Sequence, residues 1–194
     1  MSTLLLFIPI ITGFWESWAI YYKILLLITY GGVNSVFVYI DNKRPSIKIE
    51  KMLELMLGSL WGEEAHHFRS NVMIFDSKTK RLQIQYSCHM QGAIDRNLSL
   101  DPKQGCAGKA FSSNLPYVVD LTTATHNQYN IDPTKVWKSM KSVMSVPICD
   151  DEHNEHVIGV LSIDSDLDYN TVKFREDKVL NTANTYADFI GEWL

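Results

Sequence analysis

The fold is decided by two apolar stretches of the chain, SVMSVPI at residues 142–148 and VIGVLSIDS at residues 157–165. Both are rich in β-branched residues, and a charged stretch at residues 150–156 separates them, a pattern typical of two antiparallel strands joined by a hairpin. Side chains alternate between the two faces of a strand. The first stretch is therefore expected to direct one set of side chains to one face of a sheet (Ser142, Met144, Val146 and Ile148) and the other set to the opposite face (Val143, Ser145 and Pro147).

The segments that precede these strands extend the same sheet. Alternating apolar residues predict strands at residues 71–75 and 82–88, joined by a polar turn. A short helix is expected from Gly105, a brief strand at residues 115–120, and a final amphipathic helix after Phe174. This order predicts an α+β fold (an α/β sandwich), in which helices flank one face of an antiparallel sheet.

Five motifs in this order resemble those of a GAF domain. They are the Gly105-x-x-Gly108 helix start, Pro116-x-Val118-Val119-Asp120, Ser145-Val146-Pro147-Ile148, Ile158-Gly159-Val160-Leu161 running into Asp164-Ser165, and Phe174-x-Glu176-Asp177. The resemblance covers the chain from about Leu53 to Leu194. It implies a cavity between the sheet and the crossover segment at residues 120–141. GAF-like domains bind cyclic nucleotides, tetrapyrroles or other small molecules there, and some bind no ligand and act as dimerisation modules.

The resemblance also indicates which residues would surround a ligand. The central strand would supply the floor of the cavity, and the crossover segment would supply its lid. The predicted ligand-binding residues are Asp120, Thr122, Tyr129, Trp137, Ser145 and Asp164. For Asp120 a second interpretation stays open, in which its carboxylate caps the turn after the strand. Two acidic side chains at the rim disfavour a densely phosphorylated ligand unless a nearby lysine compensates.

The enzymes that resemble this chain reduce free methionine sulfoxide with cysteines. The resemblance implies one cysteine at the third position of the Gly-x-x-Gly turn, where this chain has Ala107, and another in the crossover segment, which has none. Cys106 is one position away and is expected to behave as a buried apolar residue. The sequence therefore predicts no enzymatic activity and no cofactor. It also predicts no metal site, because the histidine pair His66-His67 lacks the spacing that places two imidazoles on one helix face.

Residues 1–40 form an apolar segment with only two charged side chains, Glu16 and Lys23. Its uninterrupted part, Trp18–Ile40, has 23 residues, and a membrane-spanning helix needs about 20. The segment therefore predicts a transmembrane anchor at residues 1–42 with one or two spans. A pair of buried helices in a soluble protein is the alternative. Basic residues follow the segment directly (Lys43, Arg44, Lys48 and Lys51), which places the rest of the chain in the cytoplasm by the positive-inside rule.

A helix is expected within the connecting segment, residues 43–67. Its apolar residues recur at the i, i+3, i+4 spacing of a single helix face (Ile49, Met52, Leu53, Met56 and Leu60). Two partners for this face stay open: the same helix of a second copy in a homodimer, or the domain at residues 68–194 that follows.

Charge is distributed unevenly over the 194 residues, whose net charge is −4. The balance of 18 basic and 22 acidic residues argues against binding to a nucleic-acid polymer, which favours a basic surplus. From Cys149 to the end there are 11 acidic and 3 basic residues. The sequence favours a membrane-anchored small-molecule sensor or effector, for which a cyclic-nucleotide-type ligand is one option. Two alternatives remain: a dimerisation module without a ligand, and a thiol-based redox sensor that uses Cys88, Cys106 or Cys149.

Overall fold

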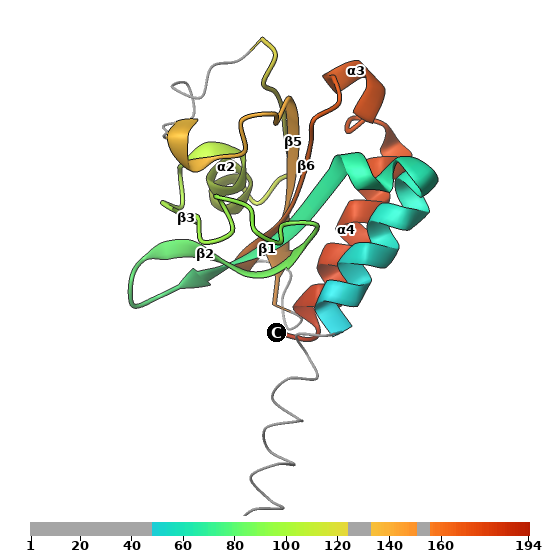
Figure 1. The fold of residues 1–194 in the computed structure, drawn as a ribbon. Helices are drawn as coiled ribbons and strands as arrows, with labels where there is room; N and C mark the ends of the chain where they lie inside the picture. Colours follow the sequence, from blue (N-terminus) through green and yellow to red (C-terminus); the bar gives the residue numbers. More distant parts are fainter. Residues whose placement is uncertain (1–47, 124–132, 151–155) are drawn as a thin grey trace, which may run out of the picture. The chain divides into compact units, whose positions relative to one another are not determined.

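A computed structural model describes residues 48–123, 133–150 and 156–194 of the chain (Figure 1). These residues belong to one compact unit, Pro45–Leu194. The predicted anchor at residues 1–42 and most of the predicted hairpin at residues 150–156 lie outside the described residues. Among the residues that are described, none of the helices combines the length and the apolar character needed to cross a bilayer.

Six antiparallel strands form a single sheet in the spatial order β3-β2-β1-β6-β5-β4. Their bounds are β1 Phe68–Asp76, β2 Arg81–Cys88, β3 Ser99–Leu100, β4 Tyr117–Asp120, β5 Ser142–Cys149 and β6 Val157–Ser165. The strands that the alternation predicts are therefore present, and β6 has the predicted bounds. The two-residue strand β3 was not predicted, because two residues carry no detectable alternation.

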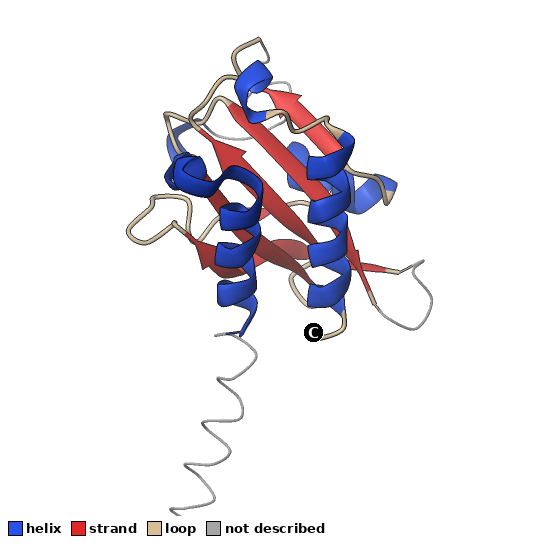
Figure 2. Ribbon diagram, turned by 90° about the vertical axis from the view of Figure 1, so that its right-hand side faces the viewer, coloured by secondary structure: helices blue, strands red, loops and turns tan. Residues whose placement is uncertain are grey.

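The α-helices are a helix at residues 48–61 (the 48–61 helix), α2 Gly105–Ser113, α3 Tyr169–Val172 and α4 Asp177–Gly191. Short 3-10 helices lie at Gly62–His67 (η2) and Pro133–Lys135 (η4). The 48–61 helix and α4 lie side by side over one face of the sheet (Figure 2), whereas α2 lies on the opposite face (Figure 1). The prediction that helices flank only one face is therefore wrong. Apolar residues such as Met73 and Val160 occupy the second face and require a cover of their own.

The face under the 48–61 helix and α4 (the helix face) holds the larger hydrophobic core. Ile49, Leu53 and Met56 of the 48–61 helix are fully buried in it, together with residues of α4 and of four strands. Trp61 stacks on Phe68, the first residue of β1, with ring centroids 3.8 Å apart. The sequence left two partners open for the apolar face of this helix. In the structure this face packs against the domain at residues 68–194 of the same chain.

The alternation predicted along β5 is confirmed. Met144, Val146 and Ile148 belong to the helix face, whereas Val143 and Ser145 line a cavity on the other face. The strand β6 follows the same pattern, with Leu161 and Ile163 in the helix-face core and Ser162 and Asp164 at the cavity. The second face (the cavity face) therefore contains Ser145, Ser162 and Asp164, whereas Ser142 and Ser165 of the same strands fall on the helix face.

Candidate ligand-binding site

A row of three polar side chains crosses the middle of the cavity face. Asn71 of β1 pairs in register with Ser162 of β6, and Ser162 pairs with Ser145 of β5. All three are buried, with 6%, 5% and 0% of their surface exposed, respectively. The hydroxyl groups of Ser145 and Ser162 hydrogen bond to each other at 2.8 Å, but the side-chain oxygen Oδ1 of Asn71 has no hydrogen-bond partner. Three other side-chain atoms of the described chain (Ser70 Oγ, Asp150 Oδ1 and Tyr169 Oη) are likewise buried without a partner, so this feature by itself does not mark a ligand site.

A cavity of about 70 Å³ lies against this polar row. Apolar side chains provide most of its wall. They come from the strands and also from α2, from the loop at residues 89–98 (the β2–β3 loop) and from the crossover segment. The apolar lining residues are Met73, Ile84, Met90, Leu98, Leu100, Ala107, Val119, Leu121, Val136, Met140 and Val143. This volume admits a few water molecules or a small organic group, since one water needs about 10–15 Å³. A small apolar chamber with a few polar groups is typical of a ligand site.

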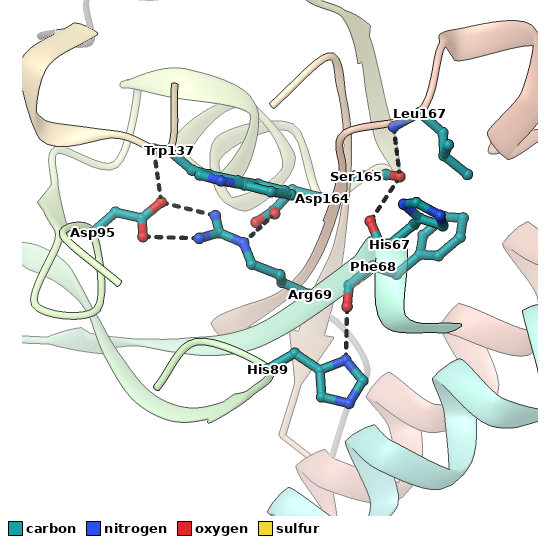
Figure 3. Close-up of polar contacts among 9 residues, drawn as sticks. All are labelled: His67, Phe68, Arg69, His89, Asp95, Trp137, Asp164, Ser165 and Leu167. Carbon is teal, nitrogen blue, oxygen red and sulfur yellow. Dashed lines mark hydrogen bonds and ion pairs between the residues drawn. The ribbon is translucent and has the colours of Figure 1, made fainter. Parts of the chain in front are cut away.

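A buried ion cluster lies beside the polar row (Figure 3). The Arg69 guanidinium donates through Nε to Asp164 at 2.6 Å and through its two terminal nitrogens to both oxygens of Asp95, at 3.1 and 2.8 Å. The Trp137 ring covers the guanidinium at 4.2 Å from its centroid, and the Trp137 backbone N–H donates to Asp95 at 3.1 Å. One arginine is therefore shared by two carboxylates and covered by an aromatic ring.

Asp95 connects two loops to the central sheet. It lies in the β2–β3 loop, while Trp137 belongs to the crossover segment and Arg69 to β1. The same loop is also attached at its start, where His89 Nδ1 donates to the backbone oxygen of Phe68 at 2.9 Å. The two loops that cover the cavity are thus held in place by one carboxylate.

Burial changes the protonation of two groups that line the cavity. It raises the pKa of Asp164 to about 6, although the adjacent Arg69 opposes the increase. It raises the pKa of the Cys106 thiol to about 12, so this thiol is protonated at neutral pH. Cys106 is 6% exposed and its Sγ donates to the backbone oxygen of Tyr117 at 3.2 Å, which confirms that it is buried. Burial also raises the pKa of Cys88 and of Cys149.

The structure separates the predicted site residues into groups. Ser145 and Asp164 line the cavity, and Trp137 lies on Arg69. Asp120 and Thr122 bind each other instead, because the Thr122 N–H and hydroxyl donate to Asp120 Oδ1 at 2.9 and 2.6 Å. This is the turn-capping role left open for Asp120, and the described crossover residues at the cavity wall include its neighbour Leu121. Tyr129 lies outside the described residues, and a ligand-binding role for all six stays a prediction.

Sequence reasoning missed four residues of this site: Arg69, Asn71, Asp95 and Ser162. Arg69 and Asn71 are two positions apart on β1 and so share a face, as Ser162 and Asp164 do on β6. Two strands that each carry polar residues at alternate positions would have indicated a polar interior face. Asp95 had no such signal, because it lies in a turn-rich loop.

No family model matches the sequence, and no match was found among curated proteins. Solved structures do match, and one is the GAF domain region of a candidate membrane protein from Geobacter sulfurreducens PCA. It has a TM-score of 0.61 and 19% identity, over 80% of this chain and 96% of that one. The free methionine-R-sulfoxide reductase from Neisseria meningitidis, in complex with its substrate, has a TM-score of 0.59 and 18% identity, over 80% and 81%. The GAF domain of an Acinetobacter phosphoenolpyruvate-protein phosphotransferase has a TM-score of 0.53 and 12% identity, over 83% and 90%.

These similarities correct one prediction and confirm another. The prediction of no enzymatic activity is wrong as far as the fold is concerned, because free methionine-R-sulfoxide reductases are enzymes and share this fold at 18% identity or less. Enzymes therefore share this fold, although this chain lacks cysteines at two positions that the resemblance implies. The predicted resemblance itself is confirmed by the similar structures, several of which are GAF domains. From its sheet order, its helices and these similarities, the chain has the fold of a GAF domain.

Proposed function

We propose that this chain is a signalling domain that binds a small molecule in the cavity on the cavity face. The observation that carries the proposal is the cavity of about 70 Å³, which is mostly apolar and lies against the buried polar row of Asn71, Ser162 and Ser145. A core that served only for packing would be expected to fill this space, because protein interiors are close-packed. The fold supports the same function, since GAF domains are small-molecule-binding signalling or regulatory modules.

Attachment to a membrane is the second part of the proposal. It is supported by the apolar run Trp18–Ile40, which carries one charged residue, and by the basic residues that follow it. The full chain is expected to sediment with membranes and to resist extraction by alkaline carbonate. Recovery of the full chain as a soluble monomer without detergent would contradict the anchor and leave the cavity proposal standing.

Blocking the cavity tests the binding proposal. Ala107 lies on α2 at the cavity wall, and Ala107→Leu would fill the chamber without adding a polar group. Ser112→Leu places the same side chain on the exposed side of the same helix and serves as the matched control. The thermal unfolding of the three proteins is compared with and without a low-molecular-weight cell extract.

The extract is expected to raise the unfolding temperature of the wild type and of Ser112→Leu, but not that of Ala107→Leu. Fractionation of the extract and mass spectrometry would then identify the ligand. An equal increase in all three proteins would place the site elsewhere. No increase in any of them would favour the dimerisation module.

A further inference from the structure

The ion cluster holds one cation and two carboxylates away from water (Figure 3). The side chains of Arg69, Asp95 and Asp164 are 7%, 5% and 6% exposed, respectively. When all three groups are ionised, the cluster has one negative charge in excess. A buried excess charge is costly, and two carboxylates that share a site do not ionise independently. A proton on one of the two carboxylates would therefore neutralise the cluster.

The two carboxylates are held unequally, so the proton goes to one of them. Asp95 accepts hydrogen bonds from both terminal nitrogens of Arg69 and from the Trp137 N–H. Asp164 accepts one hydrogen bond within the described chain, from Arg69 Nε. Hydrogen bonds that a carboxylate accepts favour its ionised form, so Asp164 takes up the proton first. In agreement, burial raises the pKa of Asp164 to about 6, and the charge of Asp95 acts in the same direction.

The protonation of Asp164 is controlled from within the cluster. Among the described residues, the charges that act on it are those of Arg69 and Asp95. Cys106 of α2 lines the same cavity, but its thiol is protonated at neutral pH. The other titratable groups of the neighbouring elements have partners elsewhere or are exposed (His67 with Asp166, His89 with the Phe68 oxygen, Lys141 with Asp168, and exposed Arg96).

Movement of the loops would change the surroundings of Asp164. When the β2–β3 loop leaves β1, it takes the charge of Asp95 away and admits water, while Arg69 stays beside Asp164 on β1. Each of these changes lowers the pKa of Asp164. The closed loops therefore bind the proton more tightly than the open loops, and by linkage the proton stabilises the closed loops.

We propose that the ion cluster is a proton-operated latch, in which a proton on Asp164 leaves Arg69 to Asp95 alone and holds both loops closed, and loss of this proton loosens them. The latch consists of described residues of β1, β6, the β2–β3 loop and the crossover segment. Its consequence for binding rests on the proposed function: a ligand would reach the cavity more easily at pH 7.5 than at pH 5.

Hydrogen exchange of the full chain, followed by mass spectrometry at pH 5 and pH 7.5, measures the opening of the loops. Each rate is corrected for the pH dependence of exchange in an unstructured peptide. The protection of residues 89–98 and 133–141 should fall about fivefold or more from pH 5 to pH 7.5. The turn at residues 77–80 is the internal control. The Lys80 N–H donates there to the Asp76 oxygen at 2.8 Å, and its protection should not change.

Three variants assign the response to the cluster. Asp164→Asn keeps the shape and an acceptor for Arg69 but cannot change its charge. Its loops should be equally protected at both pH values, as in the wild type at pH 5. Asp95→Asn removes the pair that holds the loops, so their protection should be low at both pH values. Asp166→Asn is the matched control, because Asp166 lies two residues beyond Asp164 and pairs with His67. It should respond to pH as the wild type does.

Several results would overturn the latch. Equal protection of the loops at the two pH values in the wild type would do so, as would a wild-type response in Asp164→Asn or in Asp95→Asn. Loss of the response in Asp166→Asn would assign it to the pair of His67 and Asp166 instead. None of these measurements uses a ligand. Failure of the latch therefore leaves the proposed function standing, and failure of the Ala107→Leu experiment leaves the latch standing.

Discussion

The two faces of the sheet are built from the same strands but exclude water by different means. On the helix face, hydrocarbon side chains such as Leu53, Phe68 and Phe174 are fully buried against one another. On the cavity face, the buried residues include Arg69 with its two carboxylates, and a chamber remains open. Burial of apolar surface stabilises a fold directly, whereas a buried ion cluster roughly offsets its own desolvation. The comparison indicates that the helix face supplies most of the stability, while the cavity face keeps the space that the proposed function requires.

The largest effect is expected from a cavity made on the helix face. Phe68 is fully buried between Trp61 and Phe174, and Phe68→Ala should lower the free energy of unfolding by about 3–5 kcal/mol in chemical denaturation. Leu55→Ala is the control, because Leu55 is 55% exposed on the 48–61 helix and its loss should change stability by less than about 0.5 kcal/mol. Similar losses for the two variants would contradict the assignment of stability to this face.

Removal of the arginine from the ion cluster should cost slightly less. Arg69→Met leaves Asp95 and Asp164 buried without a cation, and we expect a loss of about 3 kcal/mol in the free energy of unfolding. Adding Asp95→Asn and Asp164→Asn to this variant should recover most of that loss, since no unpaired charge would then remain. A triple variant as unstable as the single variant would show that packing of the arginine, rather than its charge, matters.

The protonation of Asp164 should appear in the pH dependence of stability. Burial raises its pKa from 3.8 to about 6, so between these values the folded chain holds a proton that the unfolded chain has lost. This contribution to stability is complete below pH 4 and is lost as the pH rises through about 6. The stability of Asp164→Asn relative to the wild type should therefore improve from pH 4 to pH 7 in denaturation curves. A difference that stays constant over this range would contradict the raised pKa.

A smaller effect is expected from loosening the loops over the cavity. Cys106 lines the chamber and is 6% exposed, so we expect labelling of its thiol to depend on movement of the loops. The substitutions Cys88→Ala and Cys149→Ser make it the only thiol of the chain. In this background Asp95→Asn should increase the labelling rate about tenfold, because the carboxylate joins both loops to β1. Asp166→Asn, which removes the partner of His67 elsewhere, should leave the rate unchanged. Equal labelling rates of Cys106 in the two variants would show that Asp95 does not control the movement of the loops.

The smallest effect is expected at Asp120. Its carboxylate accepts two hydrogen bonds from Thr122 at the surface, and these bonds lower its pKa. Asp120→Ala should therefore reduce stability less than any change described above and should not alter the labelling rate of Cys106. A strong loss of ligand binding in this variant would restore Asp120 as a site residue.

The sequence predicted the fold better than the site for a physical reason. Strands and helices are encoded by local periodicity, so β5, β6, α4 and the alternation around Ser145 could be found within single segments. The ion cluster depends on pairs far apart in sequence: Arg69 meets Asp164 across 95 positions and Asp95 across 26. Periodicity carries no information about such pairs, and the register between β1 and β6 is needed to find them.

Asp120 and Thr122 of the crossover segment show that a sequence can also predict site residues that the structure uses elsewhere. Asp120 and Thr122 have the side chains that a ligand would need, but two polar residues so close in sequence can satisfy each other in a turn. Asn71 appeared in the sequence only as part of a strand. Its place beside Ser162 at the cavity depends on the register of β1 against β6, which only the three-dimensional structure reveals.

The position of β1 has a mechanical consequence. Phe68 belongs to the helix-face core and packs on Trp61 at the end of the 48–61 helix, while the next residue, Arg69, holds the loops over the chamber (Figure 3). The β2–β3 loop is attached to both residues, through His89 at the Phe68 oxygen and through Asp95 at the guanidinium. A single peptide unit therefore joins the residue that holds the loops over the chamber to the residue that packs against the helix at the start of the described chain. The two faces of the sheet are connected at this point by covalent bonds, without a long relay of side chains.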